Sequence, residues 1–266
     1  MKRLKVFLLG GTRESIEIIK FVKEKYNSFI LTTTTTEHGS KLAVEGGSDK
    51  TTSRPLPIDE IMDILDNSDF DVIVDATHPF ATHITKTAIE VSKLCEIPYI
   101  RFERPTLDRK NLEYPNIYYV KSFEDAGKLI EKKFNKLNVL HFAGANTMKD
   151  VVKYVSPEKF YPRILEIESS FEKCEELGIE KSHIIPMRGT STVEENIELI
   201  ERIDGGLIIT KESGKIGGLD SKINAAIEKD IPIIIIEKPE VEELDKNSIV
   251  TNFKELKEKL YAETGI

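Results

Sequence analysis

Two adjacent glycines, Gly10 and Gly11, follow an apolar run and precede a stretch with helical periodicity. Glycines at such a turn let the backbone approach a phosphate, and the helix N-terminus adds unpaired N–H groups and a partial positive charge. The segment that continues through Thr12 and Glu14 is therefore a candidate pyrophosphate loop. The third glycine of the usual dinucleotide fingerprint is missing, so a tight turn without a ligand is the alternative.

The segment DATHPFA is the second candidate, and it follows the apolar residues 72–74. Loops at the carboxyl ends of neighbouring parallel strands flank the same ligand, so we expect this segment to face the glycine loop. Pro79 suits the first position of a helix, where its missing N–H would have no partner. The residues expected to bind a ligand here are Asp75, Ala76, Thr77 and His78. The alternative for Asp75 is that it caps backbone N–H groups.

A run of threonines, residues 32–36, is compatible with a strand, and Thr32 and Thr33 could bring hydroxyls near an adenosine ribose. Glu37 follows it at a separation that loosely matches the acidic residue that binds the ribose 2′-hydroxyl in NAD sites. No arginine stands beside it to meet a 2′-phosphate. The pattern therefore favours NADH over NADPH.

The third candidate follows another apolar strand and reads TKESGKIGG, with Lys222 one helical turn further on. It does not align with the phosphate loop of nucleoside triphosphatases, so phosphoryl transfer is disfavoured. A glycine-rich turn with lysines can instead bind carboxylates or phosphates, although a solvated basic turn is the alternative. Its candidate residues are Lys211, Ser213, Lys215 and Lys222, and Gly214 is expected to bind the cofactor.

Arginines also stand at the predicted ends of strands, where a planar guanidinium fork can bind a carboxylate. Arg101, Arg104, Arg163 and Arg188 occupy such positions. A single arginine there is more often part of a structural ion pair, whereas several that converge would form a carboxylate site.

The composition is that of a globular chain, with 266 residues of which 39% are hydrophobic. A net charge of −8 argues against nonspecific nucleic-acid binding, which needs a basic surface. The longest apolar runs are too short to cross a membrane, and the basic start with its short apolar run does not form a complete signal peptide. We therefore expect a cytoplasmic protein without nucleic-acid or membrane partners. The oligomeric state stays open, and a monomer is compatible with the sequence.

Metal and disulfide chemistry are not indicated. Cys95 and Cys174 are far apart and form no paired motif. His78 and His83 are five positions apart, which does not stack them on one helical face. No metal site is predicted.

Short β-branched runs alternate with amphipathic stretches along the whole chain, which predicts an α/β fold of two Rossmann-like lobes, each a mostly parallel sheet flanked by helices. We expect a dinucleotide-binding lobe over residues 1–135 and a second α/β lobe over residues 136–266 that completes the cofactor and substrate cleft. The charged segment 131–138 is the candidate hinge. Strands are expected at residues 5–9, 29–33, 71–75, 97–102, 117–120, 139–142, 161–167, 183–186, 206–210 and 231–236, and helices at 15–25, 58–65, 79–94, 147–154, 193–203, 219–229 and 252–261.

Taken together, the segments resemble the precorrin-6A reductase family, known as CobK in aerobic and CbiJ in anaerobic corrin synthesis. The matching segments are LLGGTRES, DATHPFA, IPYIRFERP and TKESGKIGGLDSKINAAIEKDIPIIIIEKP, in the family's order. The chain departs from the family's pattern at Thr106 and Leu107 and at residues 189–192, so substrate contacts there do not carry over.

The resemblance implies hydride transfer from NADH or NADPH to one double bond of the tetrapyrrole precorrin-6A, or of its cobalt form, in cobalamin biosynthesis, with the cofactor in a cleft between two lobes. We expect catalytic roles for Lys211, Ser213 and Arg13, because cations and donors relieve the charge left by hydride addition. Substrate carboxylates are expected to bind Arg13, Arg188, Lys215 and Lys222. The proton donor and the presence of cobalt are left open.

Two other functions remain possible at this point. One is a different nicotinamide-dependent dehydrogenase or epimerase, although the Tyr-x-x-x-Lys pair of the short-chain type is absent at Tyr114 and at Tyr154. The other is a two-lobed nucleotide-binding protein without catalytic activity, which would bind its ligand without consuming it.

Overall fold

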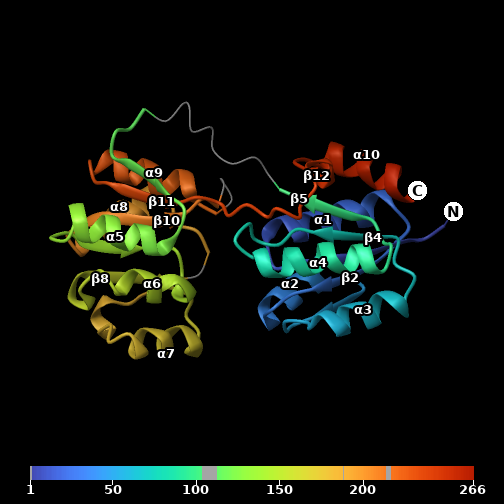
Figure 1. The fold of residues 1–266 in the computed structure, drawn as a ribbon, viewed down its shortest axis with the longest axis horizontal. Helices are drawn as coiled ribbons and strands as arrows, with labels where there is room; N and C mark the ends of the chain where they lie inside the picture. Colours follow the sequence, from blue (N-terminus) through green and yellow to red (C-terminus); the bar gives the residue numbers. More distant parts are fainter. Residues whose placement is uncertain (1, 104–112, 188, 214–216) are drawn as a thin grey trace. The chain divides into compact units, whose positions relative to one another are not determined.

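The computed structural model describes residues 2–103, 113–187, 189–213 and 217–266. Contacts between residues divide the chain into two units. Unit 1 comprises Met1–Pro105 and Pro239–Ile266, and unit 2 comprises Thr106–Lys238. Figure 1 shows the end of the chain, in red, within the same unit as the blue N-terminal elements. The division therefore differs from the boundary expected at residue 135 in two ways, because residues 106–135 belong to unit 2 and the end of the chain returns to unit 1.

The sheet of unit 1 is parallel throughout and has the order β12-β5-β4-β1-β2-β3. Its strands are β1 (Leu4–Leu9), β2 (Ser28–Thr33), β3 (Lys50–Thr52), β4 (Val72–Asp75), β5 (Tyr99–Phe102) and β12 (Ile249–Val250). Its helices are α1 (Arg13–Lys25), α2 (Glu37–Gly46), α3 (Ile58–Asp66), α4 (Thr82–Leu94) and α10 (Phe253–Thr264), with a 3₁₀ turn η5 (Lys246–Ser248).

Helices cover both faces of this sheet, as the alternation of buried residues along the strands requires. One face packs against α1, α2 and α10, which contribute Ile18, Ala43 and Leu260. The other face packs against α3 and α4, which contribute Leu65 and Ile89. The near-continuous apolar runs of the strands follow from this burial on both sides.

The sheet of unit 2 is also parallel and has the order β6-β11-β10-β7-β8-β9. Its strands are β6 (Ile117–Val120), β7 (Asn138–His141), β8 (Phe160–Ile164), β9 (Ile185–Pro186), β10 (Gly205–Lys211) and β11 (Ile233–Ile236). Its helices are α5 (Phe123–Lys133), α6 (Met148–Val152), α7 (Glu168–Glu176), α8 (Val193–Arg202) and α9 (Leu219–Glu228), with 3₁₀ turns η2 (Ala145–Thr147), η3 (Pro157–Lys159) and η4 (Lys181–His183).

Each sheet has a topological switch point, where successive strands begin to be added on the opposite side of the first one. In unit 1 the chain runs outward from β1 through β2 to β3 and then returns to β4 on the other side of β1. In unit 2 it runs from β7 through β8 to β9 and returns to β10. Ligands of open α/β sheets bind at the carboxyl ends of the strands at such points. The loops after β1, β4, β7 and β10 are therefore the places to examine for a site.

The predicted fold class, two Rossmann-like lobes with parallel sheets and flanking helices, is confirmed. Two local predictions were wrong. The proposed hinge at residues 131–138 covers the end of α5 and the start of β7, inside unit 2. Pro79 does not begin α4, because Pro79 lies in a turn in which the Ala81 N–H donates to the His78 carbonyl at 2.8 Å.

Helices α2, α5 and α7 have no counterpart among the expected helix ranges. Helix α2 is short and buries Ala43 alone, and α7 buries only Ser170 and Cys174, so neither carries a strong apolar stripe. In the described part of the chain, every helix is too short or too polar to cross a membrane.

Candidate active-site loops

In the glycine loop after β1, Gly10 is packed against the neighbouring strand, whereas the backbone at Gly11 is open. A Cβ atom on Gly10 would lie 2.8 Å from Cγ2 of Thr32, so the neighbouring strand leaves room for hydrogen only. Gly11 has φ of +98°, a conformation that favours glycine, and a Cβ atom there would have no neighbour within 4 Å. The loop is therefore fixed at its first glycine and uncovered at its second.

Helix α1 begins immediately after this loop with a capping box. The Ser15 N–H donates to Oγ1 of Thr12 at 3.2 Å, and the Thr12 N–H donates to Oγ of Ser15 at 3.3 Å. Within the described residues, the N–H groups of Gly11, Arg13 and Glu14 donate to no acceptor. Free donors at a helix N-terminus form a site for an anion, so these residues fit the pyrophosphate of a dinucleotide.

The loop after β4 lies against the glycine loop. Oγ1 of Thr12 donates to the carbonyl oxygen of Ala76 at 2.7 Å, and Leu9 at the end of β1 pairs with Asp75 at the end of β4. The two segments that the sequence suggested as partners are thus contiguous at the switch point of unit 1.

The Asp75 carboxylate is enclosed by donors and has no exposed surface. Its Oδ1 accepts from Nη1 of Arg101 at 2.6 Å and from both N and Oγ1 of Thr77 at 2.9 and 2.7 Å. Its Oδ2 accepts from the hydroxyls of Thr85 and Tyr99, each at 2.8 Å. This geometry matches the capping interpretation, and the buried carboxylate positions the loop instead of contacting a ligand.

Arg101 extends the support beyond Asp75. Its Nη2 donates to the Thr77 carbonyl at 3.0 Å, and its Nε donates to Oε1 of Glu103 at 3.0 Å. Burial alone would lower the pKa of this guanidinium. The Asp75 and Glu103 carboxylates raise it by more than burial lowers it, so the net shift is upward. Burial, and then the charge of Asp75, raise the pKa of Tyr99, so its hydroxyl stays protonated and donates to Asp75. A structural ion pair was the usual role expected for a single arginine at a strand end, but the partners of Arg101 could not be predicted because they lie on other strands and helices.

The remaining residues expected in unit 1 fall into two groups. Alternate residues of β2 face the core, and Thr32 is one of them. It is fully buried and shares a hydrogen bond of 2.8 Å with Ser48, so its hydroxyl does not reach a ligand. Thr33 is only partly buried, Glu37 opens α2 with an exposed side chain, and His78 is exposed with Nδ1 accepting from the Phe80 N–H at 3.2 Å.

In unit 2, the end of β10 and the loop after it carry Lys211 and Ser213, two of the three residues expected to be catalytic. The Ser213 N–H donates to the Lys211 carbonyl at 2.9 Å, and Oγ of Ser213 lies 3.4 Å from the Gly217 carbonyl. Nζ of Lys222 donates to Oγ1 of Thr210 and to the carbonyl of Gly217, each at 3.1 Å. Lys222 thus joins the strand to its loop. Arg188, Gly214 and Lys215 lie outside the described residues, as do Arg104, Thr106 and Leu107.

A second basic group lies on the neighbouring strands of the same unit. The guanidinium of Arg163, on β8, lies 4.1 Å from the centre of the Phe142 ring, which follows β7. Its Nη1 donates to Oγ of Ser191 at 2.5 Å and to Oδ1 of Asn196 at 3.2 Å. Asn196 is fully buried on α8, and a buried asparagine on an apolar helix face was the sequence signal that could have indicated this polar cluster.

Burial shifts the ionisation of these groups. It lowers the pKa of Lys222 to about 7, helped by the charges of Arg163 and Lys211, and it lowers the pKa of Lys211 as well. The pKa of Arg163 falls to about 10 for the same reason. Burial, and then the Lys211 charge, hold the pKa of His141 at about 3, so His141 is neutral at physiological pH. Among the described residues, Arg163 and Lys222 form no ion pair, so these two cations lack a close carboxylate partner there.

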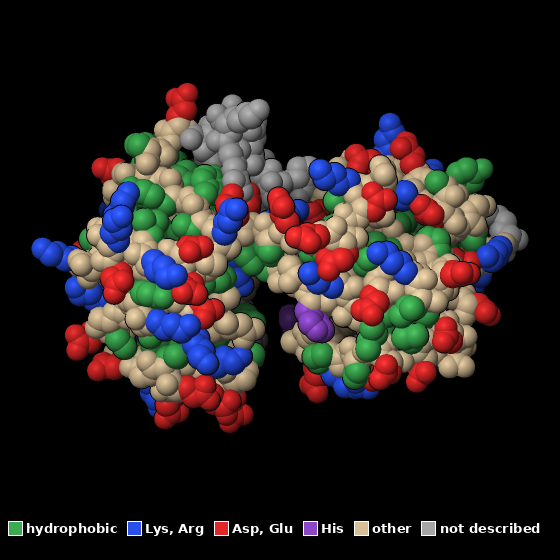
Figure 2. All heavy atoms as spheres, viewed as in Figure 1, with side chains coloured by type: hydrophobic (Ala, Val, Ile, Leu, Met, Phe, Trp, Pro, Cys, Tyr) green, Lys and Arg blue, Asp and Glu red, His purple; other side chains and the backbone are tan. Residues whose placement is uncertain are grey.

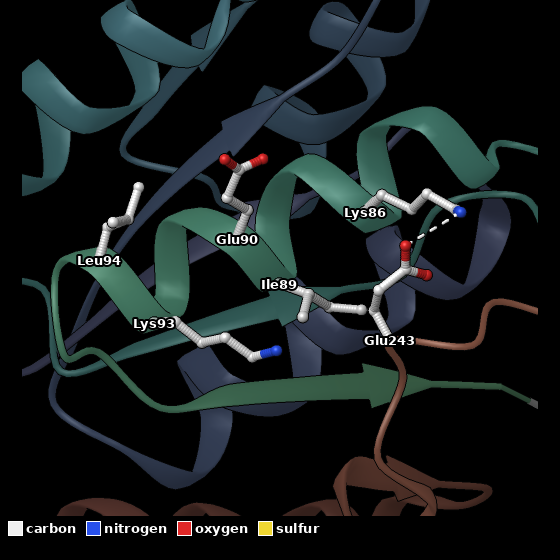
Figure 3. Close-up of a pocket in the computed structure, with 6 residues that line it drawn as sticks. All are labelled: Lys86, Ile89, Glu90, Lys93, Leu94 and Glu243. Carbon is white, nitrogen blue, oxygen red and sulfur yellow. Dashed lines mark hydrogen bonds and ion pairs between the residues drawn. The ribbon is translucent and has the colours of Figure 1, made fainter.

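Figure 2 shows basic and acidic side chains interspersed over the visible face. A shallow hollow of about 500 Å³ lies on α4, where Lys86 pairs with Glu243 across its rim at 3.1 Å and Leu94 is largely exposed (Figure 3). This hollow lies on the outer side of α4, and its residues belong neither to the glycine loop nor to the loop after β4.

The strand orders and the loops at both switch points define a protein of the doubly wound, Rossmann-like class. The chain belongs to the family described as precorrin-6x reductase CbiJ/CobK, whose model matches residues 5–260. It is 40% identical over 240 residues to a cobalt-precorrin-6A reductase of Methanocaldococcus jannaschii, covering 90% of this chain and 92% of the relative. It is 35% identical over 256 residues to a cobalt-precorrin-6A reductase of Methanothermobacter thermautotrophicus, covering 96% and 83%.

A solved structure of CobK precorrin-6A reductase has the same fold, with a TM-score of 0.74, 18% identity, and coverage of 99% of this chain and 98% of that one. At this identity the likeness speaks for the fold alone. The family expected from the sequence segments is confirmed by the match over residues 5–260.

Replacing Asp75 with Asn should lower the free energy of unfolding by about 3 kcal/mol, because it leaves the buried Arg101 guanidinium beside a neutral amide. Tyr99→Phe removes one donor to the same carboxylate and should cost about 1 kcal/mol. Urea unfolding of both variants measures the difference. Equal losses would show that the charge of Asp75 contributes nothing beyond its hydrogen bonds.

Lys222 makes stability depend on pH. Between its folded pKa of about 7 and its ordinary value of 10.5, the unfolded chain binds more protons, so the free energy of unfolding rises with pH, by up to about 1.4 kcal/mol per pH unit. Lys222→Met should remove this rise. Urea unfolding at about pH 7.5 and about pH 9.5 should show that the free energy of unfolding of Lys222→Met exceeds that of wild type by less at the higher pH. Lys149→Met, at an exposed lysine on α6, is the control, and parallel curves for wild type and Lys222→Met would contradict the assignment.

Proposed function

We propose that this chain reduces one double bond of precorrin-6A, or of its cobalt form, to the corresponding precorrin-6B in cobalamin biosynthesis. The observation that carries the proposal is the family match over residues 5–260. The uncovered glycine loop at the switch point of unit 1 supports it, because a reductase of this kind needs a dinucleotide site. The relatives named above are cobalt-precorrin-6A reductases, which favours the cobalt-containing substrate.

The dinucleotide would be held by unit 1. The free N–H groups of Gly11, Arg13 and Glu14 would bind the pyrophosphate, and the neighbouring loop of Ala76 and Thr77 would line the same site. When bound, the reduced nicotinamide supplies the hydride. Glu37 at the start of α2 favours NADH, and the choice between NADH and NADPH is part of this proposal.

Unit 2 would bind the carboxylate arms of the tetrapyrrole. Lys222 brings a buried positive charge to the loop after β10, and Arg188, Lys215 and Arg13 complete the proposed set of substrate contacts. Lys211 and Ser213 would stabilise negative charge that develops on the conjugated ring, with Arg13 as a further cation. A cation in a partly buried site acts strongly on such charge because little water screens it. The reaction would take place in the cytoplasm.

The reaction itself can be tested by incubating the protein anaerobically with precorrin-6A and with cobalt-precorrin-6A, each with NADH and with NADPH. We expect loss of the reduced-nicotinamide absorbance together with a change in the tetrapyrrole spectrum. Binding of a nucleotide without consumption, for both tetrapyrroles, would instead indicate a binding protein and would refute the proposed activity.

Lys211→Ala should lower turnover on the order of 100-fold, because it removes a cation close to developing charge. NADH affinity, measured by fluorescence titration without substrate, should stay within about twofold, since the cofactor loops lie in unit 1. Lys257→Ala, at an exposed lysine of α10, provides the matched control. Unchanged turnover with unchanged saturation behaviour would remove Lys211 from the reaction.

A further inference from the structure

Arg163 has only part of its hydrogen-bonding capacity in use. A guanidinium carries five N–H donors, and among the described residues only Nη1 donates, to Ser191 and Asn196. Its Nε and Nη2 donate to no described residue, and the Phe142 ring covers one face of the plane. Both acceptors of Nη1 are neutral groups. The edge of the fork that suits a carboxylate is therefore without a partner in the described part of the chain.

Lys222 is a second cation in the same surroundings. It is 5% exposed, and its ammonium uses two of its three donors, on the Thr210 hydroxyl and the Gly217 carbonyl. Among the described residues neither Lys222 nor Arg163 forms an ion pair. The pKa of Lys222 is lowered by burial and then by the charge of Arg163, which shows that the two cations repel each other.

A shared polar framework holds the two cations in place. Asn196 accepts from Arg163 through Oδ1 and donates through Nδ2 to the Thr192 carbonyl at 2.8 Å and to Oγ of Ser221 at 3.4 Å. Ser221 precedes Lys222 in α9 and donates to the Ser191 carbonyl at 2.8 Å. The orientation of Arg163 is thus coupled to the start of α9.

Such an arrangement is costly unless something compensates the charge. Two cations taken out of water without counter-ions destabilise the folded chain, and mutual repulsion adds to that cost. Among the described residues, the Glu195 carboxylate favours the charge of Arg163, but the Glu195 side chain is exposed and accepts from the Thr192 N–H in a helix cap. The protein therefore keeps a buried positive charge that a ligand can neutralise.

We propose that Arg163 and Lys222 form a buried oxyanion pocket in unit 2 that binds one carboxylate arm of the substrate, with the guanidinium fork gripping both oxygens. The inference rests on the proposed function for the identity of the substrate, and it adds Arg163, with Asn196 as its positioning residue. A planar fork and a point charge together recognise the flat, two-oxygen shape of a carboxylate. A phosphate of the cofactor offers similar chemistry, so the test separates the two sources.

The test uses the full chain and calorimetric titration with tricarballylate, inorganic phosphate, NADH and NADPH, for wild type and for the variants Arg163→Gln and Lys222→Met. Arg202→Gln and Lys149→Met, at exposed positions of unit 2, are the matched controls. We expect tricarballylate affinity to fall at least about tenfold in both pocket variants and in neither control, with dinucleotide affinities within about twofold of wild type. Asn196→Ala should weaken tricarballylate binding less than Arg163→Gln.

Urea unfolding without ligand provides a second readout. If the two cations serve ligand binding, Lys222→Met should be at least as stable as wild type, because it removes an uncompensated buried charge. Loss of stability in both pocket variants with unchanged tricarballylate affinity would overturn the proposal and make the cations structural. Loss of phosphate or dinucleotide affinity in place of tricarballylate affinity would also overturn it. Absence of precorrin reduction, with tricarballylate binding intact, would refute the proposed function alone.

Discussion

The ion pair between Arg101 and Asp75 is the interaction on which the first unit's site depends. The two side chains meet at 2.6 Å with almost no exposure, and the same guanidinium also bonds Thr77 in the loop after β4. That loop receives the Thr12 hydroxyl from the glycine loop, so a charge fixed on β5 sets the position of backbone that starts two strands away. Because the carboxylate and the cation neutralise each other inside the protein, the Asp75–Arg101 pair adds no net charge to the site, where backbone N–H groups and the exposed Arg13 side chain are available to a ligand.

The second unit has the same strand order about its switch point. Its buried cations differ from Arg101 because the described residues offer them no carboxylate partner. Arg163 on β8 and Lys222, whose Nζ donates to Thr210 on β10, form no ion pair among the described residues, and His141 at the end of β7 stays neutral because its pKa is about 3. A protein that needed these residues only for stability would gain by replacing them with apolar side chains. Retained uncompensated charge is the pattern expected where binding a ligand, and not folding, sets the residue type. The site of unit 1 thus combines backbone donors with Arg13, whereas unit 2 contributes the side-chain cations Arg163 and Lys222.

The sequence could predict the parts of this arrangement that depend on local pattern. Alternating apolar runs and helical stripes indicate parallel sheets. Gly10 and Gly11 mark the turn after β1, because Gly10 must fit against a close neighbour and Gly11 must adopt a positive φ, and both glycines lie in one short segment. Long-range partners are beyond such reasoning. Nothing near Arg101 in the sequence shows that it will meet Asp75, and Thr32 appeared available to a ligand until the register of β2 placed it against Ser48. Arg163 was visible as a basic residue at a strand end, but its neutral partners come from α8 and the segment before it.

The division of the chain into units was hidden for a related reason. Strand β12 is two residues long and carries too little apolar pattern to be noticed, yet it completes the sheet of unit 1 by pairing Ile249 with Arg101 and Val250 with Phe102. Helix α10 then buries Leu256 and Leu260 in the same core as β1 and β4. The residue that holds Asp75 therefore lies on a strand whose outer neighbour is contributed by the last part of the chain. The C-terminal segment therefore supports the glycine loop indirectly, through β5 and the Arg101–Asp75 pair. Among the described residues, no hydrogen bond joins that segment to the loop itself.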